Sequence, residues 1–130
     1  MCLKDLFYIT FVSSNYDSTI DFYRNSYTFF PGNDPLAYAA ETRWLNSSGN
    51  EVNKYTTDWL YAEIHLNHDC LSSDTVSNFQ ARSILTHEYG HAFGLDHSPM
   101  QFSIMWGNYM SAGTDSVHQF DNASICYLYN

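Results

Sequence analysis

The 130-residue sequence is poor in basic residues and in cysteine, and each scarcity excludes a class of function. Five Lys and Arg face fourteen Asp and Glu, a formal net charge of −9, which argues against nucleic acid and anionic membranes as partners. The three cysteines form no Cys-x-x-Cys pair, so neither a thiolate zinc site nor a disulfide framework is expected, although the number leaves room for one disulfide.

Long apolar runs are also missing. No stretch approaches the length of a membrane-spanning helix, and Met1 is not followed by a basic segment leading into an apolar run of secretory length. Because no Asp-x-Asp-x-Asp-Gly loop is present, the spacing of the acidic residues does not indicate a calcium site, and calcium is left open. Hydrophobic residues make up 45% of the chain and aromatic residues 18%, which is typical of a single globular domain.

Three histidines and a glutamate occupy one short segment. His87 and His91 are four residues apart, so on a helix both imidazoles would face one ion. Glu88 can then reach a metal-bound water without being a ligand. Gly94 can end the helix in a left-handed conformation, and His97 would supply a third imidazole that leaves the fourth position of a tetrahedral zinc ion open. Chance grouping on a solvated helix face would not explain the glycine and the third histidine, so the pattern predicts a catalytic zinc site.

This segment resembles the extended zinc signature of the metzincin metalloproteases, and Ser98 directly after the third histidine is similar to the matrixin branch, which includes the matrix metalloproteinases. Ser103-Ile104-Met105 resembles the Met-turn that lies beneath the zinc in this clan, and residues 120–129 resemble the matrixin C-terminal helix. The resemblance extends from about Ile64 to the last residue. It implies an α+β, zincin-like catalytic domain with a twisted mixed β-sheet, a zinc-binding active-site helix and a C-terminal helix.

The activity implied by the resemblance is zinc-dependent hydrolysis of peptide bonds by a metalloendopeptidase. One zinc ion held by His87, His91 and His97 would activate a water molecule, and Glu88 would act as general base and then as general acid. The substrate would be a protein or peptide bound in extended form. A monomeric enzyme located outside the cell or at its surface, acting on extracellular matrix, is the family expectation.

Three further positions are expected to support the site. Met105 would form the Met-turn, and Gly94 would terminate the zinc helix. Asp121 matches the matrixin aspartate that supports the Met-turn, its alternative role being a helix-capping charge. Phe120 replaces the neighbouring aspartate that pairs with the freed N-terminus of the mature enzyme, so that activation contact is not expected.

The family resemblance also leaves alternatives open. Matrixin domains begin with a strand and a long helix that have no room before Leu6, so residues 1–130 are expected to form a single catalytic domain lacking both elements. A zinc-binding but catalytically inactive fragment or interaction domain is one alternative. A zinc hydrolase that acts on something other than protein is another.

Alternation of apolar with polar residues and turn chemistry predict the remaining elements. Strands are expected over Leu6–Val12, Leu36–Leu45 and Trp59–Leu66, with Leu36–Thr42 as an edge that binds substrate by strand addition. A long surface loop with a helical turn near Ile20–Tyr23 is expected over Ser13–Asp34, and a turn over Asn46–Asn50. His65, His68 and Asp69 are expected to be surface residues and not a second metal site.

The helical predictions rest on caps and periodicity. Ser77 and Gln80 fit a capping box for a zinc helix that runs to about Phe93, and a second helix is expected over Gln119–Tyr129. The intervening loop, Pro99–Ala112, would carry Trp106–Met110 as a wall of the substrate side-chain pocket. The positions of the zinc helix expected to be buried are Ala81, Ile84, Leu85 and Ala92.

Overall fold

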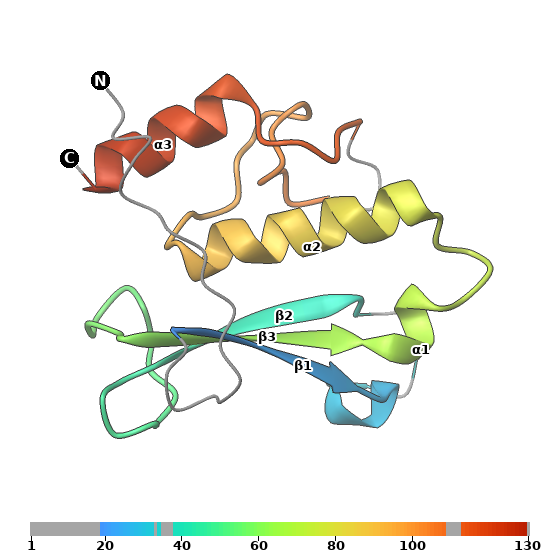
Figure 1. Ribbon diagram of the computed structural model, residues 1–130, viewed down its shortest axis with the longest axis horizontal. Helices are drawn as coiled ribbons and strands as arrows, with labels where there is room; N and C mark the ends of the chain where they lie inside the picture. The colour runs from blue at the N-terminus through green and yellow to red at the C-terminus, as the bar shows by residue number, and fades with distance from the viewer. Residues whose placement is uncertain (1–18, 33, 35–37, 109–112, 130) are drawn as a thin grey trace.

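The computed structural model describes residues 19–32, 34, 38–108 and 113–129, and it has a sheet covered on one face by two stacked helices (Figure 1). The strands are β1 (Ile20–Asn25), β2 (Ala40–Leu45) and β3 (Tyr61–Asn67), in the order β1-β3-β2. β3 is parallel to β1 and antiparallel to β2, so the sheet is mixed, as predicted. The strand expected over Leu6–Val12 and the beginning of the one expected from Leu36 lie outside the described residues.

β1 corrects the prediction of a long loop with a helical turn at Ile20–Tyr23. The segment is a strand whose residues pair with β3, Phe22 opposite Ile64, and it is followed by a 3-10 helix, η1 (Tyr27–Phe29). Aromatic side chains leave β1 on both faces: Phe22 packs on Tyr89 at 5.2 Å between ring centroids, and Tyr23 stacks in the opposite direction. An apolar residue on each face removes the alternation by which a half-buried strand is identified.

β3 is the best-predicted strand, but both of its faces are covered. Ala62 and Ile64 are buried on one face. On the other face His65, expected at the surface, is only 6% exposed because the rings of Tyr23 and Phe29 stack on either side of it at 5.0 and 4.5 Å. Its ring nitrogens are also satisfied, Nδ1 by Asn25 at 2.8 Å and Nε2 by Glu63 at 3.0 Å.

The turn between β2 and β3 begins as predicted. The amide of Asn46 donates to the carbonyl of Asn50 over 3.0 Å, and Gly49 takes the positive φ of 77° that closes the turn. The chain then returns along the outer side of β2, where the amide of Val52 donates to the carbonyl of Trp44 over 2.8 Å. After β3 a short helix, α1 (His68–Leu71), leads toward the long central helix.

α2 (Asn78–Ala92) begins at the predicted capping box. The Ser77 side chain accepts from the amide of Gln80, and the Gln80 side chain accepts from the amide of Ser77 over 2.9 Å. Ile84 and Ala92 are buried as expected, and Ala81 is half-buried. Leu85 is not buried: it is 37% exposed, because it lies about 100° around the helix from Ile84 and therefore on a different face.

α2 ends at the predicted glycine. Gly94 has φ 88°, the left-handed conformation that residues with a Cβ rarely adopt. Its amide donates to the carbonyl of His91 over 2.8 Å, and the amide of Leu95 donates to the carbonyl of Gly90 over 3.0 Å. These two bonds form a Schellman motif, which satisfies the last carbonyls of the helix and reverses the chain beneath it.

α3 (Gln119–Tyr129) occupies the predicted residues and lies on the far side of α2 from the sheet (Figure 1). A small core of Leu95, Ile104 and Met105 lies in this layer, with Ile125 of α3 packed against it. Cys126 is disulfide-bonded, and Cys70 is a buried free thiol. Among the described residues, no helix has both the length and the apolar character needed to cross a bilayer.

Candidate metal centre

Three imidazoles converge where α2 meets the turn that follows it. His87 and His91 lie one helical turn apart on α2, and the Schellman reversal brings His97 back toward them. One ring nitrogen from each lies within 4.8 Å of the other two. In the described part of the chain, this is the one group of three or more His, Cys, Asp or Glu side chains close enough to share an ion, and it contains the three histidines predicted as ligands.

Backbone carbonyls fix the rings of the two helical histidines. Nδ1 of His87 lies 2.7 Å from the carbonyl oxygen of Ile104, and Nδ1 of His91 lies 2.8 Å from that of Leu95. Because a carbonyl oxygen can only accept, each Nδ1 carries the proton and each Nε2 keeps its lone pair. This is the tautomer that metal-binding histidines adopt when a partner holds their other nitrogen.

Burial keeps these two imidazoles neutral near physiological pH. It lowers the pKa of His87 and that of His91 from the ordinary 6.5 to about 4. His87 is only 1% exposed, whereas His97 lies at the surface. The site therefore has a buried wall formed by the helix and an accessible side formed by the turn.

The donor set fits a zinc ion. Two nitrogens bound to zinc at about 2.0–2.1 Å in a tetrahedral arrangement lie roughly 3.3 Å apart. Nε2 of His91 and Nε2 of His97 are 3.2 Å apart. A hydrogen bond between these two rings would have the same separation, but it would not explain why the third ring, that of His87, turns toward the same point.

Glu88 lies beside this group but faces the sheet edge. It is 3% exposed, and its Oε2 accepts a 2.7 Å hydrogen bond from Oγ1 of Thr42 on β2. Burial raises the pKa of the Glu88 carboxyl from 4.5 to about 7, although the hydrogen bond from Thr42 opposes this rise. A carboxyl group with a pKa near 7 can both take up and release a proton at neutral pH.

The segment beneath the histidines has the expected buried methionine. Met105 is 2% exposed, and its carbonyl oxygen accepts from the amide of Ser98 over 2.7 Å. Its Sδ lies against Gly90 so closely that a Cβ at that position would overlap it. Of the predicted substrate wall, Trp106 is half-buried, and residues 109 and 110 lie outside the described residues.

Asp121 connects α3 to this segment. Its carboxylate accepts from the hydroxyl of Ser103, from the amide of Ile104 at 3.1 Å and from the amide of His118 at 2.8 Å. The contacts to Ser103 and Ile104 join α3 to the segment that carries Met105, and the contact to His118 is that of a helix cap. The carbonyl of Ile104 also contacts Nδ1 of His87, so Ile104 connects Asp121 to one of the three converging histidines.

Three contacts around the site were not identified from the sequence, those made by Thr42, Trp44 and Lys54. Thr42 contacts Glu88, Trp44 donates from Nε1 to the carbonyl of His91 over 3.1 Å, and Lys54 contacts the turn after α2. All three lie about 40 or more positions from their contacts, so no local spacing could have indicated them.

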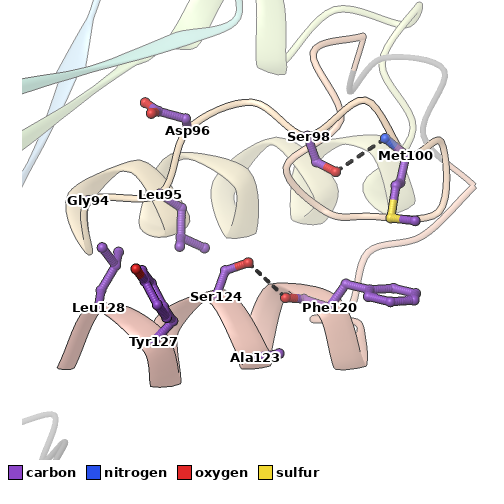
Figure 2. A pocket seen from close by; sticks show the side chains of 10 residues that line it. All are labelled: Gly94, Leu95, Asp96, Ser98, Met100, Phe120, Ala123, Ser124, Tyr127 and Leu128. Carbon is purple, nitrogen blue, oxygen red and sulfur yellow. Dashed lines mark hydrogen bonds between the residues drawn. The ribbon is translucent and has the colours of Figure 1, made fainter. Parts of the chain in front are cut away.

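A separate hollow of about 520 Å³ lies between the turn after α2 and α3 (Figure 2). Neither Glu88 nor any of the three histidines lines it. The hollow is lined by Gly94, Leu95, Asp96, Ser98, Met100, Phe120, Ala123, Ser124, Tyr127 and Leu128.

Comparison with known protein families gives one finding that agrees with this geometry. The family model for matrixin, a peptidase family, matches residues 9–130, which is nearly the whole chain. Neither the curated proteins nor the solved structures contain a significant match.

Proposed function

The chain belongs to the matrixin family of metallopeptidases, and we propose that it is a zinc-dependent metalloendopeptidase. Its zinc ligands would be His87, His91 and His97, and its general base would be Glu88. The observation that carries this proposal is the convergence of three imidazoles, two of them held in the metal-binding tautomer, beside a buried carboxylate.

When bound, zinc supplies Lewis acidity that makes water a better nucleophile and polarises the scissile carbonyl. Glu88 takes a proton from the attacking water and then delivers it to the leaving amine. Thr42 holds Oε2 of that carboxylate, which leaves Oε1 to exchange the proton. Burial raises the pKa of Glu88 to about 7 in the metal-free chain, and the positive charge of a bound zinc ion would lower it, which favours the carboxylate form that acts as base.

The outer side of β2 is the surface proposed to bind the substrate. β2 is an edge strand, and Val52 pairs with its C-terminal part at Trp44. Within the described residues, no strand pairs with the outer side of residues 40–43, and Thr42 in this stretch contacts the proposed base. An extended peptide added antiparallel there would gain main-chain hydrogen bonds while passing the metal centre.

Further properties are proposed from the family. Matrixins are generally extracellular, and we propose that this enzyme acts outside the cell or at its surface on protein or peptide substrates, including those of the extracellular matrix. A peptide added to this edge would be held through its backbone, and because successive side chains of a strand point to opposite faces, every second side chain would face the enzyme.

The experiment that tests the proposal compares the wild-type chain with Glu88→Ala and with Glu51→Ala. Glu51 is an exposed glutamate, so it serves as a matched control for the loss of a carboxylate. Zinc content is measured by atomic absorption, and activity by cleavage of a quenched generic peptide. We expect about one zinc per chain in all three proteins, cleavage by wild type and Glu51→Ala, and a loss of several orders of magnitude in Glu88→Ala.

Each other result has a distinct meaning. Zinc in all three proteins with no cleavage in any would favour a zinc-binding interaction domain over an enzyme. Loss of zinc from Glu88→Ala would contradict the assignment of Glu88 as a base that is not a ligand. Cleavage of esters or other compounds without cleavage of any peptide would identify a zinc hydrolase with a non-protein substrate.

A further inference from the structure

We propose that Lys54 is a positioning residue of the metal centre, which clamps the turn after α2 and thereby fixes His91 and His97. Lys54 lies between β2 and β3, far along the chain from the histidines. The proposal rests on the proposed function, because it assumes that the histidines bind zinc. It concerns a side chain that neither touches the metal nor takes part in proton transfer.

The ammonium group of Lys54 is enclosed by acceptors of that turn. Its Nζ lies 2.6 Å from Oδ1 of Asp96, 3.1 Å from the carbonyl oxygen of Leu95 and 3.4 Å from that of Gly94. The Lys54 side chain is only 6% exposed. A lysine that gives up this much hydration is held in place by its partners, since a buried ammonium is costly without them.

Two aromatic rings form the rest of the enclosure. Nζ lies 4.9 Å from the centroid of Trp44 and 5.1 Å from that of Tyr55, distances at which ring faces attract a cation. The hydroxyl of Tyr55 also donates to Oδ1 of Asp96 over 2.7 Å, so one carboxylate oxygen accepts from both side chains. The loop between β2 and β3 therefore contacts the turn through an ion pair, hydrogen bonds and cation–π contacts that share Lys54 and Asp96, and not through a single ion pair.

This network contacts one proposed ligand, His91, and the residue next to another, His97. The carbonyl oxygen of Leu95 that accepts from Lys54 also accepts from Nδ1 of His91. Trp44, whose ring faces Lys54, donates from Nε1 to the carbonyl of His91. Asp96 is the residue before His97, so the ion pair fixes the backbone from which that imidazole projects.

The side of the turn that faces α3 is held at other residues. The hydroxyl of Tyr129 donates to the carbonyl of Phe93 over 3.0 Å, and Ile125 packs against the core that contains Leu95. In Figure 2 the Leu95 side chain points toward α3, whereas Asp96 points away from it. Packing against α3 therefore acts on Leu95 but not on Asp96. Lys54 and Tyr55 hold Asp96, immediately before His97, and the amide of Ser98, immediately after His97, donates to the carbonyl of Met105.

A simpler role for Lys54 gives a different expectation. A cation beside the last carbonyls of a helix stabilises it through the helix dipole, whatever the metal does. Its removal would then lower the stability of the metal-free protein but leave zinc affinity unchanged. A positioning role predicts that zinc affinity itself falls, because groups that orient metal ligands typically change affinity by about ten- to a hundredfold.

The test compares Lys54→Met, which keeps an unbranched apolar stem but removes the terminal ammonium group, with Arg82→Met as a control. Arg82 lies in the first half of α2, away from the turn that follows the helix, and forms an exposed ion pair with Asp115. Zinc affinity is measured by competition with a chromophoric chelator, the ligand field by the visible spectrum of the Co²⁺-substituted protein, and stability by urea unfolding of the metal-free protein.

We expect zinc to bind Lys54→Met about tenfold more weakly, with an altered Co²⁺ spectrum, and to bind Arg82→Met as it binds wild type. Asp96→Asn, which breaks the ion pair but keeps Lys54, should show a smaller change in the same direction. It also provides the test if Lys54→Met does not fold. Unchanged affinity and an unchanged spectrum in the variants, even with lower stability, would overturn the positioning role. Failure of the wild-type chain to bind zinc would instead overturn the proposed function.

Discussion

Oγ1 of Thr42 on β2 donates a 2.7 Å hydrogen bond to Oε2 of Glu88 on α2, and the same hydroxyl lies 3.1 Å from the carbonyl oxygen of Glu88. The sheet edge proposed to bind the substrate therefore also holds the carboxylate proposed as the base. Because Glu88 belongs to α2, this contact also fixes the sheet edge relative to the helix that carries the base.

Thr42→Val tests this relationship, because valine keeps the shape of threonine but cannot donate. We expect kcat to fall about tenfold while zinc content stays at the wild-type level, since the base loses the group that orients it. Steady-state kinetics on the quenched peptide, with zinc analysis of the same samples, would measure both. Thr42→Ser should retain most of the activity, because it keeps the hydroxyl. Equal activity in Thr42→Val and wild type would show that Glu88 needs no such support.

Zinc binding should stabilise the folded chain. A ligand that binds only the folded state at a hundred times its dissociation constant adds about 2.7 kcal/mol, and removal of the metal with a chelator should abolish this gain. His97→Ala should lose most of it because one of three ligands is missing. His68→Ala should keep it, since His68 on α1 contacts Arg24 and not the metal centre. Urea unfolding with and without zinc measures the difference, and an equal gain in both variants would exclude His97 as a ligand.

The effect of Gly90→Ala on the free energy of unfolding should change sign when Met105 is also replaced. Gly90→Ala places a methyl group where Met105 Sδ lies, and crowding a packed core costs about 1–3 kcal/mol. With Met105 first replaced by alanine the obstacle is gone, and the better helix propensity of alanine should make Gly90→Ala stabilising by up to about 1 kcal/mol. Denaturant unfolding of the four proteins would reveal the reversal. Additive effects would mean that the two residues do not touch.

Asp121→Asn should loosen the segment beneath the histidines. The amide keeps one acceptor oxygen where the carboxylate offers two, so at least one of its three donors loses its partner, at a cost of about 1–3 kcal/mol. Because Ile104 bonds both Asp121 and His87, weaker zinc binding should accompany the lower stability. Asp115→Asn removes the carboxylate of an exposed ion pair and should change neither quantity appreciably. If Asp121→Asn retained full stability, Asp121 would have no supporting role.

The helical half of the molecule could be predicted because its signals are local. The capping box at Ser77, the glycine at position 94 and the histidines between them lie on one continuous segment, as do the bounds of α3. Each depends on residues within one or two turns of one another. The expected grouping of the three imidazoles followed from the same short spacing.

The sheet could be predicted only in part, because its decisive contacts are distant in sequence. β1 is a strand because β3 pairs with it, and its own six residues show no alternation that would reveal this. His65 is buried because Tyr23 and Phe29 cover it from a segment interpreted as a loop. The contacts of Lys54 with the turn after α2 and of Thr42 with Glu88 gave no signal for the same reason, since each joins residues about 40 or more positions apart.

The division between local ligands and distant supports has a consequence for folding. The three histidines span eleven residues, so closing that short loop around an ion costs little chain entropy and can precede formation of the sheet. Thr42, Trp44 and Lys54 reach their partners only after β2 has docked, a slow event of high contact order. We therefore expect the three histidines to bind the metal first, and the contacts that fix their positions to form later. Early in folding the ion would exchange freely, and it would be retained once the sheet is in place.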